Sequence, residues 1–174
     1  MMIAIKSLTD DSTTVEYLRE QLLTIFGCPV KIIFEARMKL QDAAFDRQRK
    51  QTMAPELLSA LGTEDMAKDQ KILGITDVDL YAPGLNFVFG QADMIAGKAI
   101  ISLCRLHDEF YGLPTDRDKF LERATKEAVH ELGHTFGLEH CTDPKCVMHF
   151  SNSLPDTDNK EAAFCSQCRP KLIQ

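Results

Sequence analysis

The sequence predicts an α+β fold, in which a mixed β-sheet with helices is followed by a small irregular C-terminal subdomain. Short β-branched runs alternate with helical patterns up to Gly137, and glycines separate the later runs. Beyond Gly137 the periodicity stops, and cysteines and turn-forming residues accumulate. We expect a single domain over residues 1–174, with an N-terminal part at 1–137 and a C-terminal part at 138–174.

The chain begins with a predicted strand and a predicted helix. Residues 1–7 (MMIAIKS) form an apolar run that is typical of a strand. Residues 13–26 carry apolar side chains at helical spacing, and Gly27 ends that pattern. We expect Thr13 and Glu16 to form a capping box at the start of this helix.

The next segment predicts a second strand and a short helix. Residues 29–38 (PVKIIFEARM) are rich in β-branched side chains after an initial proline, which indicates a strand. Residues 39–52 are polar and predict no particular element. Residues 55–61 (PELLSAL) predict a short helix, because proline stands near the start and Gly62 follows the end.

Three more strands are predicted in the middle of the chain. They cover residues 71–81 (KILGITDVDLY), 85–90 (LNFVFG) and 98–103 (KAIISL). Glycines punctuate the runs, so we expect tight turns between them and no long crossovers.

The longest helical pattern covers residues 115–137. We expect Thr115 with Asp118 to form its capping box and Gly137 to end it. Residues 161–172 (EAAFCSQCRPKL) predict a short closing helix, which the proline near its end limits.

The net charge and the lengths of the apolar runs limit the kinds of partner and the location that we expect for this chain. A net charge of -6 argues against a general nucleic-acid or anionic-membrane surface, because both need a basic face. The N-terminal apolar run breaks at Lys6 without a basic region before it, so we expect no export signal. No run approaches the length of a membrane span. We expect a cytoplasmic protein, a monomer, with cysteines that are free or bound to metal.

Three of the five histidines lie in one short stretch, residues 129–141 (VHELGHTFGLEHC). His130 and His134 are four positions apart, so both imidazoles face the same side of the helix and can bind one ion. Because Gly137 can adopt positive φ, the chain can turn there and bring His140 back as a third ligand. Three neutral imidazoles that leave one position to water form the arrangement of a catalytic zinc site.

Glu131 stands next to the first of these histidines, where it is placed to take a proton from metal-bound water. The alternative is a surface helix whose histidines have no role. The third histidine and the glycine, both at set offsets, make that alternative much the weaker one. The stretch therefore predicts a catalytic zinc site.

Four of the six cysteines gather near the C-terminus, as C-x4-C and C-x2-C: Cys141, Cys146, Cys165 and Cys168. Four thiolates can close a tetrahedral zinc site, which would be structural and would supply folding free energy to a segment poor in apolar residues. A redox pair at the C-x2-C and a disulfide are weaker alternatives, since no βαβ pattern precedes the pair. The remaining two, Cys28 and Cys104, are expected to be small buried side chains.

The extended motif H-E-x-x-H-x-x-G-x-x-H is the signature of the metzincin metallopeptidases. Its continuation here, HELGHTFGLEHCTDPKCVM with a later CSQC, resembles the archaemetzincin branch of that group. The segments GITDVDLY, LNFVFG and KAIISLCRL are also similar to family segments. The resemblance therefore extends over most of the chain.

The resemblance implies a set of roles for these residues. The three histidines would bind a catalytic zinc ion, Glu131 would be the general base, and the four clustered cysteines would hold a second, structural zinc. Met148 would form a Met-turn, whose methionine packs beneath the metal ligands. The implied fold is a metzincin-like twisted mixed sheet with helices above an open cleft. An antiparallel edge strand would line that cleft, with residues 85–90 as the candidate, and an extended peptide could pair with it.

The implied function is zinc-dependent hydrolysis of peptide bonds, with aminopeptidase and endopeptidase activity as open alternatives. The rival hypothesis is a non-catalytic zinc protein that holds peptides in a closed or inactive cleft. Residues 150–159 (FSNSLPDTDN) are expected to shape the pocket that sets substrate preference. His149 is expected at the surface or beside the cleft. Since no tyrosine follows His140, no side chain is assigned to stabilise the oxyanion besides zinc.

Overall fold

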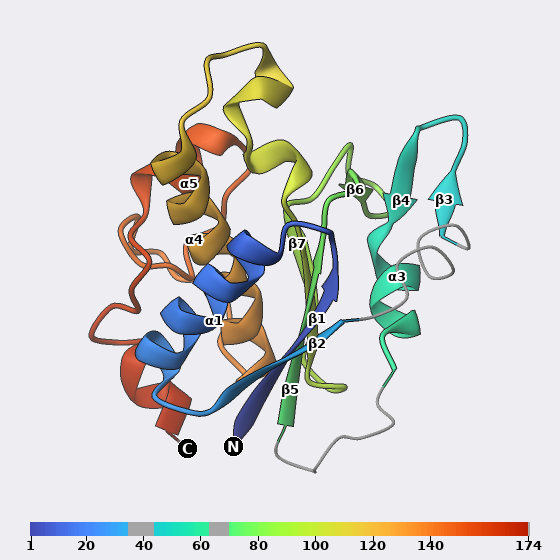
Figure 1. Cartoon of the computed structure of the whole chain (residues 1–174). Coiled ribbons are helices and arrows are strands. Elements are labelled where there is room, and N and C mark those ends of the chain that lie inside the picture. Colours follow the sequence, from blue (N-terminus) through green and yellow to red (C-terminus); the bar gives the residue numbers. More distant parts are fainter. Residues whose placement is uncertain (35–43, 63–69, 174) are drawn as a thin grey trace.

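The computed structural model describes residues 1–34, 44–62 and 70–173, and its centre is a five-stranded sheet (Figure 1). Four strands run parallel, and β7 at one edge is antiparallel to its neighbour β8. The order is β2-β1-β5-β8-β7, with bounds Val30–Phe34, Met2–Leu8, Gln70–Thr76, Lys98–Ser102 and Gly90–Asp93. A small second sheet has the order β3-β4-β6, with bounds Phe45–Asp46, Gln51–Met53 and Leu80–Tyr81.

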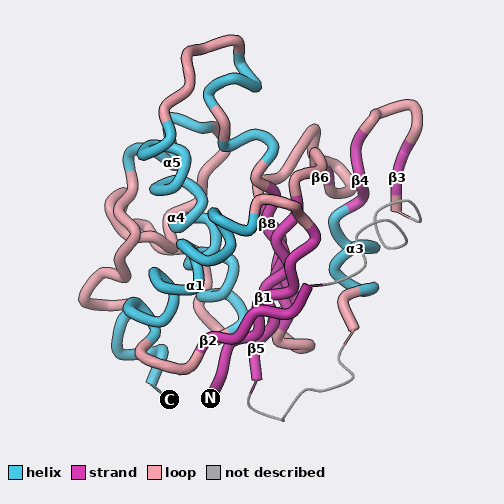
Figure 2. The backbone as a smooth tube through the Cα atoms, in the orientation of Figure 1, coloured by secondary structure: helices cyan, strands magenta, loops and turns pink. Residues whose placement is uncertain are grey.

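Helices cover both faces of the main sheet (Figures 1 and 2). Helices α1 and α4 pack on one face and the short helix α3 packs on the other. The α-helices are α1 Ser12–Phe26, α3 Ala54–Ala60, α4 Arg117–Thr135 and α5 Leu154–Asn159. The 3-10 turns are η1 Cys104–Leu106, η2 Asp108–Tyr111 and η3 Arg169–Ile173. None of the described helices has both the length and the hydropathy that crossing a bilayer requires.

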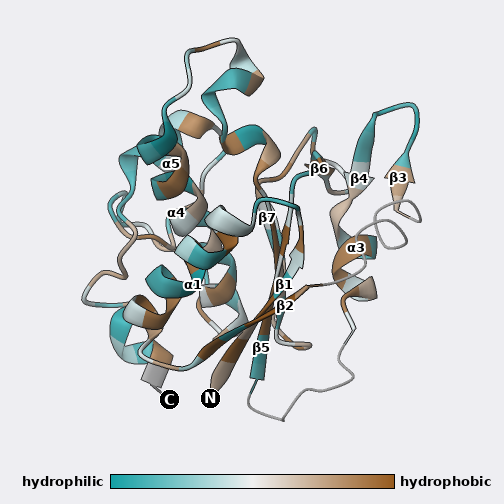
Figure 3. Ribbon diagram, viewed as in Figure 1, coloured by the Kyte–Doolittle hydropathy of each residue, from teal (hydrophilic) through white to brown (hydrophobic). Residues whose placement is uncertain are grey.

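Side-chain alternation along the strands divides the apolar residues between two cores. On β5, Leu73 and Ile75 join the core beneath α1 and α4, while Ile72 joins the core beneath α3. Because successive side chains of a strand point to opposite faces, a strand that is apolar throughout must be covered on both sides. Figure 3 shows the resulting concentration of hydrophobic residues on the strands. The mixed sheet with helices confirms the predicted fold class.

The predicted helices at 13–26, 55–61 and 115–137 are confirmed, but the capping boxes predicted for the first and the third are wrong. Asp11 caps α1 by accepting a hydrogen bond from the Thr14 amide, 3.0 Å away. Asp116 caps α4 in the same way through the Lys119 amide, at 3.0 Å. In both cases a carboxylate just before the helix takes the role that the sequence analysis gave to a threonine.

Strand boundaries differ more from the predictions. The run at 71–81 is interrupted after Thr76, and its last two residues belong to β6. Residues 85–89 form no strand beyond an isolated bridge at Val88, so the edge strand β7 begins only at Gly90. The predicted tight turn between β7 and β8 is confirmed. The parallel neighbours β5 and β8, however, are joined by a long crossover connection that includes β6 and β7. The later part of the strand predicted at 29–38 lies outside the described residues.

The closing helix predicted at 161–172 is also misplaced. Residues 161–168 are irregular, a 3-10 turn follows at Arg169–Ile173, and the α-helix of this region is α5 at Leu154–Asn159. Backbone hydrogen bonds here run to distant segments, such as the Val147 amide to the Ala163 carbonyl at 2.9 Å. Tertiary pairing therefore replaces local helix in the cysteine-rich segment.

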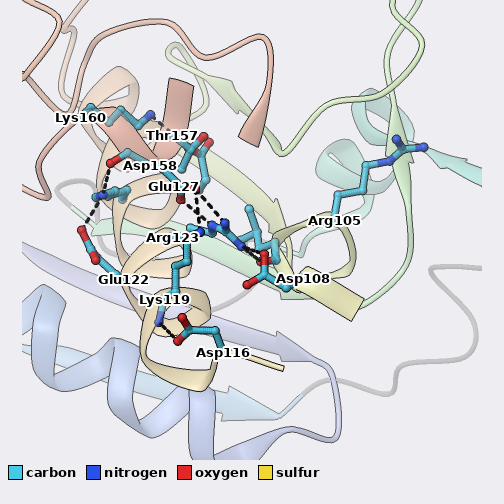
Figure 4. Close-up of polar contacts among 12 residues, drawn as sticks. Arg105, Asp108, Asp116, Lys119, Glu122, Arg123, Glu127, Thr157, Asp158 and Lys160 are labelled. Atoms are coloured by element: carbon cyan, nitrogen blue, oxygen red, sulfur yellow. Dashed lines mark hydrogen bonds and ion pairs between the residues drawn. The ribbon is translucent and has the colours of Figure 1, made fainter. Parts of the chain in front are cut away.

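A buried arginine joins α4 to the segments around it (Figure 4). Arg123 is 2% exposed and donates to both carboxylate oxygens of Asp158, at 2.6 and 2.8 Å. Its other terminal nitrogen, Nη1, donates to Asp108 at 2.8 Å and to the Leu106 carbonyl at 3.0 Å. The two carboxylates raise the pKa of Arg123, against burial, which lowers it. One side chain thus ties η1, η2 and α5 to the helix that carries two of the predicted metal ligands.

We expect Arg123→Ala to lower the free energy of unfolding by about 3–5 kcal/mol, because it leaves a buried carboxylate without its partner. Denaturant unfolding followed by circular dichroism measures this loss. Arg19→Ala is the matched control, since Arg19 forms a solvent-exposed pair with Glu16, and the expected loss there is much smaller than in Arg123→Ala. Equal losses in the two variants would contradict the assigned role of Arg123.

Candidate metal centre and cleft

The three motif histidines converge. His130 and His134 come from successive turns of α4, and His140 comes from the loop that follows. Each offers a ring nitrogen, and these nitrogens all lie within 4.8 Å of one another. Gly137, at φ 86°, allows the reversal of the chain that brings His140 back, as the sequence analysis expected.

The hydrogen bonds of the two helical histidines determine which ring nitrogens are free. The Nδ1 atom of His130 lies 2.8 Å from the Val147 carbonyl, and Nδ1 of His134 lies 2.7 Å from the Leu138 carbonyl. Because a carbonyl can only accept, both Nδ1 atoms must carry a proton. Burial lowers the pKa of both rings, most strongly that of His130, so both are neutral and their Nε2 atoms carry lone pairs.

These two Nε2 atoms face each other at 3.1 Å. Two lone pairs at that distance repel, so the contact is not a hydrogen bond in this tautomeric state. Nitrogens around a tetrahedral zinc ion lie about 3.3 Å apart, at Zn–N distances of about 2.0–2.1 Å. The arrangement fits a cation between the rings, and the donor set suits zinc.

Glu131 lies beside this cluster and is 7% exposed. Burial and the nearby charge of Glu127 raise the pKa of Glu131 to about 8, against Lys160, which lowers it. A carboxyl group whose pKa lies near neutrality can both accept and release a proton at working pH.

Met148 packs against Gly133, the residue of α4 directly before His134. A Cβ atom on Gly133 would overlap Met148 Sδ and would also approach Phe164. A glycine inside a helix costs about 1 kcal/mol relative to alanine, and here it makes room for the methionine sulfur. Met148 therefore packs on the helix that carries the first two histidines, and its role as the Met-turn residue stays a prediction.

The four clustered cysteines also converge. Their sulfurs all lie within 4.8 Å of one another, and none of the four forms a disulfide. Cys141 Sγ and Cys165 Sγ are 3.8 Å apart. Sulfurs around a tetrahedral zinc ion, at Zn–S distances of about 2.3 Å, also lie about 3.8 Å apart. Burial raises the pKa of Cys165, but hydrogen bonds from the amides of Cys168 and Gln167 and with the side chains of Cys146 and Cys168 together lower it to about 7. The donor set and its spacing fit a second metal ion.

Backbone hydrogen bonds join the two clusters. The Cys141 amide donates to the Met148 carbonyl at 2.9 Å, and the His149 Nδ1 atom lies 2.9 Å from the Cys141 carbonyl. His149 is partly buried, and this contact gives it a structural partner that the sequence did not reveal. The lone cysteines differ: Cys28 is buried as expected, and Cys104 is only partly buried.

A cavity of about 380 Å³ opens beside the histidines. The edge strand β7, the loop before it, helix α4 and the segment after Met148 contribute its walls. The polar and charged side chains that line it are Gln91, Glu127, His130, Glu131, His134, His140, Ser151, Asn152 and Lys160. Phe150, which also lines it, packs on the ring of His140 with centroids 4.9 Å apart. The expectation that 150–159 shape this pocket therefore holds for Phe150, Ser151 and Asn152.

Two charged residues of the cavity were missed by the sequence analysis. Glu127 stands one helical turn before Glu131, so helical periodicity could have placed it on the same face. Lys160 carries no comparable signal, because its position depends on how the irregular C-terminal segment folds back.

Comparison with known proteins accounts for this geometry. The family model for peptidase family M54 matches residues 6–174. The archaemetzincin of Pyrococcus furiosus is 52% identical over 150 residues, which cover 84% of this chain and 77% of that protein. The archaemetzincin of Methanocaldococcus jannaschii is 40% identical over 175 residues, which cover 99% and 93% respectively.

Solved structures of similar proteins share the fold of this chain. The crystal structure of archaemetzincin from Archaeoglobus fulgidus complexed with malonate has a TM-score of 0.83 and 36% identity, covering 98% of this chain and 99% of that one. A zinc-dependent peptidase from Methanocorpusculum labreanum has a TM-score of 0.86 and 32% identity, covering 99% and 100%. With a matching family model, close curated relatives and a shared fold around a histidine cluster suited to zinc, the chain belongs to peptidase family M54, the archaemetzincins, and is a zinc metallopeptidase.

Proposed function

We propose that the chain hydrolyses peptide bonds in the cavity beside α4, with His130, His134 and His140 as the ligands of the zinc ion and Glu131 as the general base. The observation that carries the proposal is the pair of neutral imidazoles whose Nε2 lone pairs face each other at 3.1 Å. Their Nδ1 protons are donated to carbonyls, which leaves both Nε2 lone pairs available to a metal ion.

Zinc bound there supplies a Lewis acid toward the scissile carbonyl and lowers the pKa of a water molecule to about 7. Glu131 takes one proton from the attacking water on a carboxylate oxygen and delivers it to the nitrogen of the leaving amine. A new C–O bond replaces the C–N bond, and the water is consumed. A nearby dication favours the charged form of Glu131, so it is available as a base below the pKa of about 8 that it has without metal.

The edge strand β7 is proposed to bind the substrate as an extended peptide. It is the last strand of the main sheet, so among the described strands one edge of its backbone has no partner in that sheet. Gly90, Gln91 and Ala92 of β7 line the cavity, which brings that edge beside the histidines. A substrate that adds a strand here gains main-chain hydrogen bonds without regard to its sequence.

Between the two modes of peptidase action, we favour endopeptidase action. An aminopeptidase needs an anionic group to meet the free α-amine of its substrate. Among the described residues that line the cavity, the acidic ones are Glu127 and Glu131. Glu127 already pairs with Lys160 at 3.0 Å, and Glu131 is assigned to proton transfer.

We further propose that Cys141, Cys146, Cys165 and Cys168 hold a second zinc ion that stabilises the C-terminal segment. Their converging sulfurs support this, and the segment has few regular elements of its own. The enzyme would then contain two zinc ions per chain, one catalytic and one structural.

Glu131→Gln is expected to retain zinc but to lower kcat at least a hundredfold, because it removes the base and leaves the ligands intact. Elemental analysis and cleavage of a mixed peptide library measure the two properties on one sample. Glu139→Gln is the matched control, since Glu139 is exposed and does not line the cavity. Full turnover by Glu131→Gln would refute the assignment of the base, and wild-type protein that holds zinc but cleaves nothing would favour the peptide-binding alternative.

Cys165→Ser is expected to lower the zinc content from two ions per chain toward one and to reduce the thermal midpoint of unfolding. Three thiolates bind the ion less tightly, and its binding free energy contributes to folding. Cys104→Ser serves as the control, because Cys104 lies outside the cluster. An unchanged zinc content in Cys165→Ser would count against the second site.

If the enzyme is an endopeptidase, we expect acetylation of the substrate's N-terminus to change the rate of cleavage by no more than a factor of about two. Mass spectrometry of a cleaved peptide and of its acetylated form gives both the rates and the cleavage positions. Loss of cleavage on acetylation, with single residues released from the free peptide, would establish aminopeptidase action instead.

A further inference from the structure

The cavity contains a buried lysine that hydrolysis as described above does not use. The side chain of Lys160 is fully buried, and its ammonium group pairs with Glu127 Oε1 at 3.0 Å (Figure 4). The same oxygen accepts a hydrogen bond from the Thr157 hydroxyl at 3.1 Å. Both Lys160 and Glu127 line the cavity with the histidine cluster.

The pair leaves the hydrogen-bonding capacity of the ammonium group largely unused. Lysine has three N–H donors, and within the described part of the chain Lys160 Nζ has no partner in hydrogen-bond geometry, although the ion pair brings Glu127 close. A buried charge whose donors are unmet is costly, so such a group is expected to have a ligand. Two more buried polar atoms without a partner line the same cavity, Ser151 Oγ and Gln91 Oε1.

The charges and donors favour an anionic ligand. The ammonium group of Lys160 and the hydroxyl of Ser151 can both donate to a carboxylate oxygen, and a hydrogen bond between charged groups is about twice as strong as a neutral one. An incoming carboxylate would therefore meet N–H and O–H donors that no described protein group uses.

We propose that Lys160, assisted by Ser151, binds a carboxylate of the substrate and so gives the enzyme a preference for acidic peptides. This deepens the proposed hydrolytic function and rests on it. The carboxylate can come from an aspartate or glutamate side chain near the cleaved bond or from the C-terminus of the peptide. Both sources present the same chemistry, and substrate design separates them.

The first test uses the zinc-loaded wild-type enzyme and a peptide that it cleaves. Each residue near the cleaved bond is replaced in turn by glutamate and by glutamine, and a second pair of peptides ends in a free carboxylate or an amide. We expect at least one acidic member to exceed its neutral partner about tenfold or more in kcat/KM. A preference in the first set assigns the site to side chains, and one in the second set assigns it to the C-terminus.

The variant for this test removes both charges of the pair, because Lys160→Met alone would leave the buried carboxylate of Glu127 without its ion-pair partner. In the double variant Lys160→Met with Glu127→Gln, we expect the ratio of kcat/KM for the acidic peptide to kcat/KM for the neutral peptide to fall to about one. In Glu127→Gln alone we expect this ratio to rise, because the ammonium group of Lys160 loses its ion-pair partner. Lys171→Met is the matched control, since Lys171 is exposed and outside the cavity. Equal ratios in wild type and double variant, with folding verified by thermal unfolding, would overturn the proposal.

A binding measurement separates this proposal from hydrolysis itself. Titration calorimetry of glutarate into the zinc-loaded proteins is expected to give about tenfold weaker binding to the double variant than to wild type, since any contact of glutarate with zinc is common to both. If no peptide is cleaved but this difference is found, hydrolysis fails and the carboxylate site stands. If peptides are cleaved but neither the ratio nor the affinity changes, the site fails and hydrolysis stands.

Discussion

The hydrogen bond from His130 Nδ1 to the carbonyl of Val147 is the contact on which the centre of the molecule depends. It fixes the tautomer of a buried imidazole and so leaves Nε2 free to bind a metal. It also fixes the position of Val147, whose chain neighbours are Cys146 of the sulfur cluster and Met148, which packs against Gly133. One contact between α4 and the C-terminal segment therefore aligns the imidazoles, the methionine and the thiolates.

Helix α4 can serve this centre because it is buried on two sides. One side packs on the main sheet through residues such as Ala128 and Leu132, and the other carries polar groups toward the C-terminal segment. The cost of burying those groups is offset by specific partners: Arg123 has Asp108 and Asp158, and Glu127 has Thr157 and Lys160. The helix is thus fixed along its length, which holds the histidines and Glu131 in place relative to β7.

The motif and the long helix were predictable from the sequence because both depend on spacing along one element. The caps were not, since Asp11 and Asp116 compete with nearby threonines for the same role. Residues 85–89 alternate like a strand, but Phe87 and Phe89 pack edge to face, 5.2 Å apart, and Arg105 stacks on Phe87. Tertiary contacts override the local pattern there. The burial of Lys160 depends wholly on such contacts.

The direct succession of His140 and Cys141 links the occupancy of the two proposed zinc sites. Adjacent Cα atoms are only about 3.8 Å apart, so an ion bound to the sulfur cluster confines the third histidine near the other two. Confinement lowers the entropy lost when the second ion binds, and thermodynamic linkage makes the effect reciprocal. Under scarce zinc, such coupling would reduce the fraction of half-loaded molecules relative to two independent sites. The amount of active enzyme would then respond to zinc supply more steeply than a single site allows.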